Sequence, residues 1–425
     1  MTQIKSLRTG IKFKDTPIGK IPVDWEVSKL GDVVTAFYNG GTPDTKRKEY
    51  WDGVIPWITG ADFINQKVGQ IRKYITPEGV KNSATNIVPE GNLLVVTRTG
   101  VGKLAIAPFD LAISQDISGV IPDTQKTVSA FLFWNLNYND KNLKTLRQGT
   151  SINGILREDL SSFLISLPSL SEQKKIAEIL TTVDDAIEET DRIIEKTREL
   201  KKGLMQKLLT RGIGHKKFKK TEIGKIPVDW AVVRLKEIAN VRYGLGQPPA
   251  LDDNGIPMVR ATNIHEGAIS KAGLISINRD ALPLSRNPLL KNGDIIVVRS
   301  GAYTGDIGLI TKEWEGAVAG YDLVVTPSSR INSLFLANYL LSNIIQKGYF
   351  ASLKERSAQP HLNSLQVEET PIVLPPITEQ IKIAEVISST HSEIKQEEAQ
   401  KKHLETLKKS LMQVLLTGKV RVKLH

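Results

Sequence analysis

The stretch Ile18-Gly-Lys-Ile-Pro-Val-Asp-Trp25 returns, residue for residue, as Ile223 to Trp230, an offset of 205 positions (223 minus 18). Two further strings repeat at an offset of 207 (374 minus 167, 411 minus 204): Leu167 to Gln173 is echoed by Leu374 to Gln380, and Leu204-Met-Gln returns as Leu411-Met-Gln. Such matches do not arise by chance, so the chain is an internal duplication. A duplicated protein is expected to bind a partner that also offers two related binding sites.

Length and composition narrow the class of protein. A chain of 425 residues suits two domains of roughly 150 residues plus connecting structure. No apolar run approaches the ~18 residues of a membrane span, and the N-terminal segment lacks the apolar core of a signal peptide. Because the chain has no cysteine, disulfides, zinc ribbons and thiol catalysis are excluded. We therefore expect a cytoplasmic protein with no membrane partner.

The charge balance favours a polyanionic partner. The formal net charge is +11 and the isoelectric point is near 9.4. Lys and Arg side chains gain most against a phosphate backbone, so nucleic acid is a natural candidate. Plain solubility is the alternative explanation of the same charge.

Each repeat is predicted to contain a mixed globular part followed by one long helix. Strand-like stretches at 92–97 and 104–107 alternate with Gly, Pro and Asn turns, and 294–299 is the counterpart of 92–97 in the second repeat. Helical stretches follow, around 129–136 and 333–346. Each globular part is therefore predicted to be α+β.

The long helices carry a heptad pattern. Ser171 is predicted as the N-cap of the first helix, and Thr378-Glu379 repeats this start. Apolar residues then recur at 4-3 spacing, and about 39 residues would give a rod of roughly 58 Å. The apolar positions are Ile176, Leu180, Val183, Ile187, Ile194, Leu204 and Leu208, then Ile383, Ile387, Ile394, Leu404, Leu411 and Leu415.

Pairing within one chain is favoured over a coiled coil between two chains, because the partner helix is already tethered. The order globule–helix–globule–helix then requires an antiparallel pair and places the two termini near each other. The predicted fold class is α+β, with two globular domains separated by an intramolecular antiparallel coiled coil in a pseudo-two-fold repeat. The boundaries are 1–165 and 215–370 for the globular domains, and 166–214 and 371–425 for the spacer helices.

The helices match each other in length and phase, whereas the globular parts have diverged. This contrast indicates that the paired helices act as a ruler, which holds two globular domains at a fixed separation. The two domains (the readers) would recognise different features of the ligand. On duplex DNA, two such readers would recognise two separated half-sites, and different readers would make the whole site non-palindromic. The alternative is a coiled-coil scaffold whose heads bind only proteins and have no DNA specificity.

The combination of motifs resembles the DNA-specificity subunit of type I restriction-modification enzymes. The motifs are Gly-x-Ile-Pro-x-x-Trp, the Gly-Gly-Thr-Pro turn at 40–43, Leu-Pro-x-x-x-Glu-Gln and Leu-Met-Gln-x-Leu-Leu-Thr. The second copy departs at the turn, with Tyr243-Gly-Leu-Gly-Gln-Pro248 opposite Tyr38-Asn-Gly-Gly-Thr-Pro43. The resemblance covers essentially the whole chain.

The resemblance carries functional expectations. The two heads would be target-recognition domains that each read one half of a bipartite, asymmetric site on double-stranded DNA, and the helices would set the unread spacer. The subunit would dock two methyltransferase (modification) subunits, and motor-nuclease (restriction) subunits would join them. It would carry no catalytic residues of its own.

The lack of known catalytic signatures in the sequence supports that last expectation. Gly102-Lys103 lacks the Ser or Thr and the upstream Gly of a phosphate-binding loop, and 244–249 places prolines where a dinucleotide site needs a helix start. The six His residues show no i, i+4 pair for a metal. We therefore expect no catalytic residue, no cofactor and no metal site.

Base readout needs polar side chains on rigid turns that enter the major groove. Each head offers an early turn, a turn after its buried strand and a later loop, and at least two of these three are expected to touch DNA. A single polar turn residue is more often a solvated loop tip. In the first head the candidates are Asn39, Thr42, Arg98, Thr99, Lys103, Arg147, Gln148, Ser151 and Asn153. In the second head they are Arg242, Tyr243, Gln247, Arg299, Ser300, Tyr303, Thr304, Gln359, His361 and Asn363.

Overall fold

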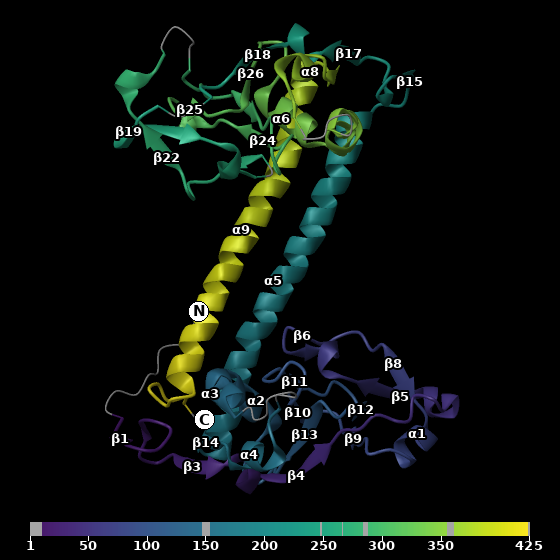
Figure 1. Cartoon of the computed structure of the whole chain (residues 1–425), viewed down its shortest axis with the longest axis vertical. Coiled ribbons are helices and arrows are strands. Elements are labelled where there is room, and N and C mark those ends of the chain that lie inside the picture. The colour runs from purple at the N-terminus through teal and green to yellow at the C-terminus, as the bar shows by residue number, and fades with distance from the viewer. Residues whose placement is uncertain are drawn as a thin grey trace. The chain divides into compact units, whose positions relative to one another are not determined.

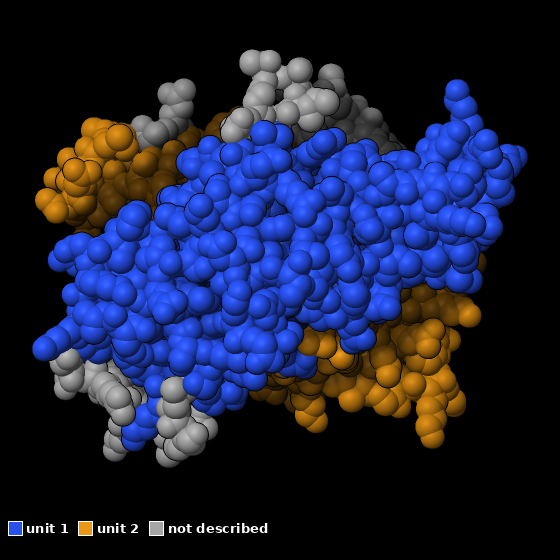
Figure 2. All heavy atoms as spheres, turned by 90° about the horizontal axis from the view of Figure 1, so that it is seen from below, with its two compact units in different colours: residues 1–191, 400–425 blue, residues 192–399 orange. Residues whose placement is uncertain are grey.

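A computed structural model describes residues 11–146, 154–246, 249–265, 267–283, 288–354 and 361–423. The chain forms two compact units (Figure 2), residues 1–191 with 400–425 (unit 1) and residues 192–399 (unit 2). The two long helices, α5 (Leu170–Arg211) and α9 (Ile377–Leu415), each contribute one stretch to each unit (Figure 1). Among the described residues, no helix combines the length and apolarity that a membrane crossing requires.

The head of unit 1 is built on two four-stranded sheets. The first is antiparallel, in the order β11 (Leu104–Ile106), β10 (Leu93–Val96), β13 (Ile117–Pro122), β4 (Val34–Asn39). The second runs β8 (Lys73–Ile75), β5 (Trp51–Ile58), β12 (Leu111–Ile113), β9 (Ile87–Val88), with β5 and β12 parallel. Two-stranded ladders join β1 (Phe13–Lys14) to β2 (Ile21–Pro22), β3 (Glu26–Lys29) to β14 (Leu164–Leu167), and β6 (Phe63–Ile64) to β7 (Lys67–Val68). The short helices are α1 (Pro77–Lys81), α2 (Ser129–Tyr138), α3 (Asp140–Thr145) and α4 (Arg157–Ser162).

The head of unit 2 repeats this plan. Its first sheet runs β18 (Ala239–Tyr243), β26 (Leu323–Pro327), β23 (Ile295–Val297), β24 (Ile307–Leu309), and its second runs β22 (Ile275–Ile277), β19 (Leu251–Val259), β25 (Val318–Ala319). The ladders pair β15 (Phe218–Thr221) with β16 (Gly224–Pro227), β17 (Ala231–Arg234) with β27 (Pro371–Leu374), and β20 (Ile264–His265) with β21 (Ala268–Ile269). The helices are α6 (Ser333–Leu341), a π-helical segment (Ile344–Phe350), α7 (Ala351–Lys354) and α8 (Ser364–Glu368). The predicted α+β class is confirmed in both heads.

A run of four buried apolar residues organises each head. In β10, Leu93 and Val95 pack into the core shared with α2 and α5, whereas Leu94 and Val96 pack into a second core on the opposite face. Side chains alternate across a strand, so a strand covered on both faces has no polar position. In the second head Ile295 and Val297 face one core and Ile296 and Val298 the other. The strand that the sequence marks most clearly therefore joins two hydrophobic cores.

The first long helix begins slightly earlier than predicted. It starts at Leu170, and the Ser169 hydroxyl accepts the Glu172 N–H at 3.4 Å. Ser169, and not Ser171, thus occupies the capping position. The preceding strand β14 ends at Leu167, and only Pro168 and Ser169 separate it from the helix.

The predicted seam is buried or half-buried along both helices, and its polar interruptions at Thr190 and Thr390 are satisfied locally. Ile176, Leu180 and Ile383 are fully buried. Thr190 and Thr390 also lie in the seam, and their hydroxyls donate to Ala186 O and Ile387 O of their own helices, so neither leaves an unpaired group.

The two long helices run antiparallel in each unit. In unit 1 Lys401 pairs with Asp191 at 2.6 Å and Lys408 with Asp184 at 2.5 Å, so rising numbers in α9 meet falling numbers in α5. In unit 2 Arg198 pairs with Glu398 at 2.6 Å. These contacts confirm an intramolecular antiparallel pair.

In each unit, the Trp of the Gly-x-Ile-Pro-x-x-Trp motif hydrogen-bonds to the Glu of the Leu-Pro-x-x-x-Glu-Gln motif. In unit 1 Trp25 Nε1 donates to Glu172 Oε2 at 3.1 Å, and in unit 2 Trp230 Nε1 donates to Glu379 Oε2 at 3.0 Å. Both tryptophans are fully buried and therefore anchor the cores of their units. The Trp of the first motif and the Glu of the helix start are therefore parts of one structural joint.

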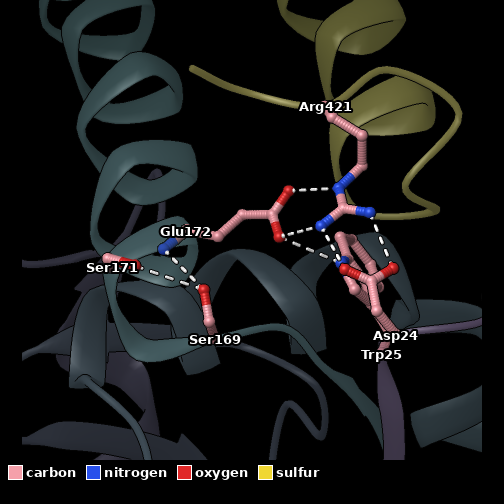
Figure 3. Close-up of polar contacts among 6 residues, drawn as sticks. All are labelled: Asp24, Trp25, Ser169, Ser171, Glu172 and Arg421. Atoms are coloured by element: carbon pink, nitrogen blue, oxygen red, sulfur yellow. Dashed lines mark hydrogen bonds and ion pairs between the residues drawn. The ribbon is translucent and has the colours of Figure 1, made fainter. Parts of the chain in front are cut away.

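The joint in unit 1 is closed by the C-terminal segment (Figure 3). Arg421 lies against Asp24 through two 2.7 Å bonds and against Glu172 at 2.7 and 2.8 Å. In unit 2, where the chain leaves α5, His215 takes the corresponding place and contacts Glu379 at 2.9 Å. Within unit 1 the last described segment of the chain therefore contacts the first repeated motif, while the two chain ends themselves lie outside the described residues.

Candidate nucleic-acid interface

The turn after the buried strand and the later loop lie side by side in the second head, and in the first head the turn contacts the residues that follow the later loop. In unit 2, Leu362 N donates to Arg299 O at 2.8 Å, and Ser300 forms an isolated bridge with His361. In unit 1, Ile155 N donates to Thr97 O, also at 2.8 Å. In the second head the strand end therefore brings together two of the three polar segments that were predicted separately.

The matching bonds define which residues are equivalent in the two heads. They place Arg299 opposite Thr97, which agrees with the predicted match of 294–299 to 92–97. Arg98 then corresponds to Ser300 and lies one position further along the turn. Thr97 is buried, whereas Arg98 is exposed. The two candidate arginines consequently occupy different environments.

The first head presents a polar surface. Asn39, at the end of β4, and the neighbouring Thr42 are exposed, as are Arg98 and Thr99. The Thr42 hydroxyl donates to the side-chain oxygen of Gln115. These side chains offer donors and acceptors of the kind that read base edges.

The second head presents an aromatic and cationic surface. The Arg299 guanidinium carbon lies 4.3 Å from the centre of the Tyr321 ring and 4.8 Å from that of Tyr243. Its Nη2 contacts His361 Nε2 at 2.8 Å. Burial, and then the positive charge of Arg299, lower the pKa of His361. The neutral imidazole can therefore accept the bond from the guanidinium.

Two further candidates lie on the turn after Arg299. Tyr303 is exposed, and its ring meets His265 edge-on at 5.7 Å. Ser300 is half-buried. The hydroxyl of Tyr243 accepts the Ser364 N–H at 3.2 Å, which ties β18 to the later loop. The three predicted segments of the second head thus converge.

Four candidates have their polar groups engaged inside the protein. Lys103 Nζ donates to the carbonyls of Gly60 and Phe63 at 3.2 and 3.4 Å. The guanidinium of Arg242 binds the buried carboxylate of Asp294 at 3.2 Å. Thr304 is buried and bonds within its own turn, and Asn363 caps α8 through the Gln366 N–H. These contacts give all four a structural role, and their predicted contact with DNA stays untested.

The remaining candidates lie outside the described residues. They are Arg147, Gln148, Ser151, Asn153, Gln247 and Gln359.

Two residues of this surface escaped the sequence-based prediction. Gln115 and Tyr321 immediately precede Asp116 and Asp322, which bind the backbone N–H groups at the end of the buried strand. Neither residue belongs to a turn motif, so no local signal marks them. Only the pairing of β13 with β10, and of β26 with β23, carries them to the reading loops.

A buried carboxylate supports the second surface. Asp322 accepts the Arg299 backbone N–H at 3.1 Å, and burial raises the pKa of this carboxyl. Among the described residues, no group of three or more His, Asp or Glu side chains could hold a metal ion. What the surfaces do offer is hydrogen bonding, aromatic stacking and positive charge.

Comparison with known proteins places this architecture. A family model described as "Type I restriction modification DNA specificity domain" matches residues 22–197 and again residues 227–406. The chain is 29% identical to the type I restriction enzyme MjaVIII specificity subunit of Methanocaldococcus jannaschii, over 97% of this chain and 96% of that one. It is 30% identical to the putative type I restriction enzyme MjaX specificity subunit of the same organism, over 97% of both chains. Its fold is similar to the type I restriction-modification S subunit from M. genitalium, with a TM-score of 0.63 at 16% identity, covering 98% of this chain and 99% of that one.

Proposed function

The chain belongs to the family of type I restriction-modification DNA-specificity subunits, and from this premise we propose that each head reads one half of a bipartite, asymmetric DNA sequence. As a member of that family, the chain is the DNA-recognition subunit of a restriction-modification complex. Family membership disfavours a scaffold whose heads bind only proteins.

The observation that carries the proposal is a shared loop framework with different side chains. Both heads use the same backbone bonds at the end of the buried strand, at Thr97 and at Arg299. The first head surrounds this point with Asn39, Thr42 and Arg98, whereas the second surrounds it with tyrosines. Different side chains on one framework favour different bases, so the combined site is expected to lack two-fold symmetry.

The proposed partners are methyltransferase and motor-nuclease subunits, in keeping with the family of the chain. The chain itself would contribute no catalytic residue. The antiparallel ion pairs of Asp184 with Lys408 and of Arg198 with Glu398 support the long helices as stiff elements. We propose that these helices set the length of the unread spacer.

The test is the methylated sequence motif. The chain is expressed with its methyltransferase subunits, and genomic methylation is mapped for the wild-type protein and for a variant whose residues 221–370 come from another family member. We expect a bipartite motif in which only one half changes. A change in both halves would contradict the two-reader proposal.

A second measurement distinguishes DNA recognition from scaffolding. Binding of the purified complex to cognate and random duplexes is followed over a range of salt concentrations. A reader that contacts phosphates should lose affinity steeply as salt rises and prefer the cognate duplex at every concentration. No preferred sequence and no salt dependence would support the scaffold instead.

A further inference from the structure

We propose that Arg299 is held by Tyr243, Tyr321 and His361 as a preoriented reader of one guanine in the half-site of the second head. These four residues are called the arginine cluster below. The inference rests on the proposed DNA-reading function and adds a residue, a base and a mechanism of positioning. Tyr321 enters it as a positioning residue.

The positive charge of Arg299 has no negatively charged partner in the described part of the chain. Within the described part of the chain, no carboxylate lies within ion-pair distance of the Arg299 guanidinium, whose side-chain hydrogen bond goes to the uncharged His361. Its Nε is buried and has no hydrogen-bond partner there. A half-buried cation without a carboxylate partner is costly, and an acceptor-rich ligand at the exposed side of the guanidinium lowers that cost. By contrast, Arg242 in the same head has Asp294.

The rings hold the guanidinium in a defined orientation. Its carbon lies 4.3 Å from the Tyr321 centroid and 4.8 Å from the Tyr243 centroid, distances at which a cation is attracted to an aromatic ring. Each tyrosine is about half exposed, at 52% and 48%, so the cluster lies at the surface. The bond from Nη2 to His361 at 2.8 Å fixes the rotation of the fork. Less side-chain freedom is then lost when a ligand binds.

The position of Arg299 favours a base edge over a phosphate. Arg299 lies at the base of its turn, where the first head has the buried Thr97, and not at the tip. A planar fork of fixed orientation matches the O6 and N7 acceptors of guanine, which is the commonest specific contact of arginine in the major groove. Phosphate contacts tolerate longer and freer side chains.

Among the residues that the structure describes, the first head has no equivalent cluster. Position 97 is a threonine, and Gln115 stands where the second head has Tyr321. Gln115 is engaged with Thr42. The guanine contact is therefore assigned to the second half-site alone.

The test uses the full complex and duplexes that carry 7-deazaguanine, which lacks the N7 acceptor, at each guanine of the second half-site in turn. For the wild-type protein we expect one position at which the change weakens binding, by part of the roughly 5- to 150-fold that a complete bidentate contact contributes, because the O6 acceptor remains. Arg299→Ala should bind the normal and modified duplexes equally at that position. Arg234→Ala is the matched control, because Arg234 lies in the same unit and pairs with Glu222 at 3.0 Å.

The tyrosine variants test positioning. Tyr321→Ala should lower discrimination between the normal and the modified duplex at the same guanine. Tyr321→Phe should retain that discrimination because the ring is kept. Since Tyr321 is half exposed, neither change should lower the melting temperature by more than a few degrees.

Several outcomes would overturn the inference. Arg299→Ala could weaken binding to all duplexes equally, which would mark a phosphate contact, or it could leave binding unchanged. Tyr321→Phe could behave like Tyr321→Ala. A wild-type protein that shows no sequence preference would instead refute the proposed function.

Discussion

Replacing Arg421 with Ala should loosen the joint that closes unit 1. Arg421 spans the exposed Asp24 and the Glu172 carboxylate, whose side chain is only 2% exposed. Removing the guanidinium leaves Glu172 buried with a single remaining side-chain donor, Trp25 Nε1 at 3.1 Å. Breaking a buried ion pair typically costs about 3–5 kcal/mol. Because the Arg421 side chain retains 20% exposure, we expect about 3 kcal/mol.

The exposed half of the contact should matter much less. The Asp24 side chain is 58% exposed, so Asp24→Asn should cost at most about 1 kcal/mol, although Arg421 lowers the pKa of this carboxyl through its hydrogen bonds. In unit 2 the corresponding change is His215→Ala. There Glu379 keeps the Ile213 N–H at 2.9 Å and Trp230 Nε1 at 3.0 Å, so we expect about 1 kcal/mol.

Hydrogen exchange resolves these local effects. In Arg421→Ala, exchange of backbone amides in segment 412–423 should speed up about a hundredfold, since each 1.4 kcal/mol is a factor of about ten. The decisive variant is Arg421→Ala combined with Glu172→Gln. If the main cost is the uncompensated charge of Glu172, the double variant should be more stable than Arg421→Ala alone. The reasoning is refuted if the destabilising effects of Arg421→Ala and Glu172→Gln simply add in the double variant. It is also refuted if Arg421→Ala destabilises unit 1 no more than Asp24→Asn does.

Three further predictions concern the reading loops and the helices. Arg98→Ala should weaken binding by ~1–3 kcal/mol and relax only the first half-site if Arg98 contacts a base; equal loss on random DNA would mark a phosphate contact instead. Inserting seven residues after Thr190 and after Glu397 adds about 10 Å to the helices and should lengthen the preferred spacer by roughly three base pairs, with lower affinity because the half-sites also rotate by roughly 100°; an unchanged spacer would exclude the helices as the ruler. The lowered pKa of His361 means that the folded loop binds fewer protons than the unfolded one, so its stability is full above the unfolded pKa of about 6.5 and falls as the pH drops through the lower folded value. Exchange at the Leu362 amide, corrected for intrinsic rate, should therefore rise on acidification, and His361→Gln should abolish that dependence.

Most of the fold follows from periodic patterns in the sequence. The buried run at 93–96, the heptad positions from Ile176 to Leu208 and the repeated motifs all depend on neighbours a few residues apart, and each indicated the right element. The misplaced N-cap at Ser171 shows the limit. Several Ser residues near the helix start satisfy the same rule, and the end of the preceding strand selects Ser169.

The candidate site was predictable only as a set of loops. The sequence marked the polar turns, and the end of the buried strand brings two of them together in the second head. It did not distinguish Arg299, stacked on two tyrosines, from Arg242, which is paired with Asp294. Both arginines stand in the pattern Val-Arg-x-Gly, at 241–244 and at 298–301, so their local sequences are alike.

The sequence by itself determined the duplication, the α+β heads and the antiparallel helix pair, because helix and strand periodicities are local and a repeat is visible without any structure. The tertiary structure decided which polar residues remain available to a ligand. Trp25 meets Glu172 across 147 positions, and Arg299 meets His361 across 62. Such contacts depend on the register of strand ladders and on the return of the chain through the long helices, and no local pattern encodes either of these.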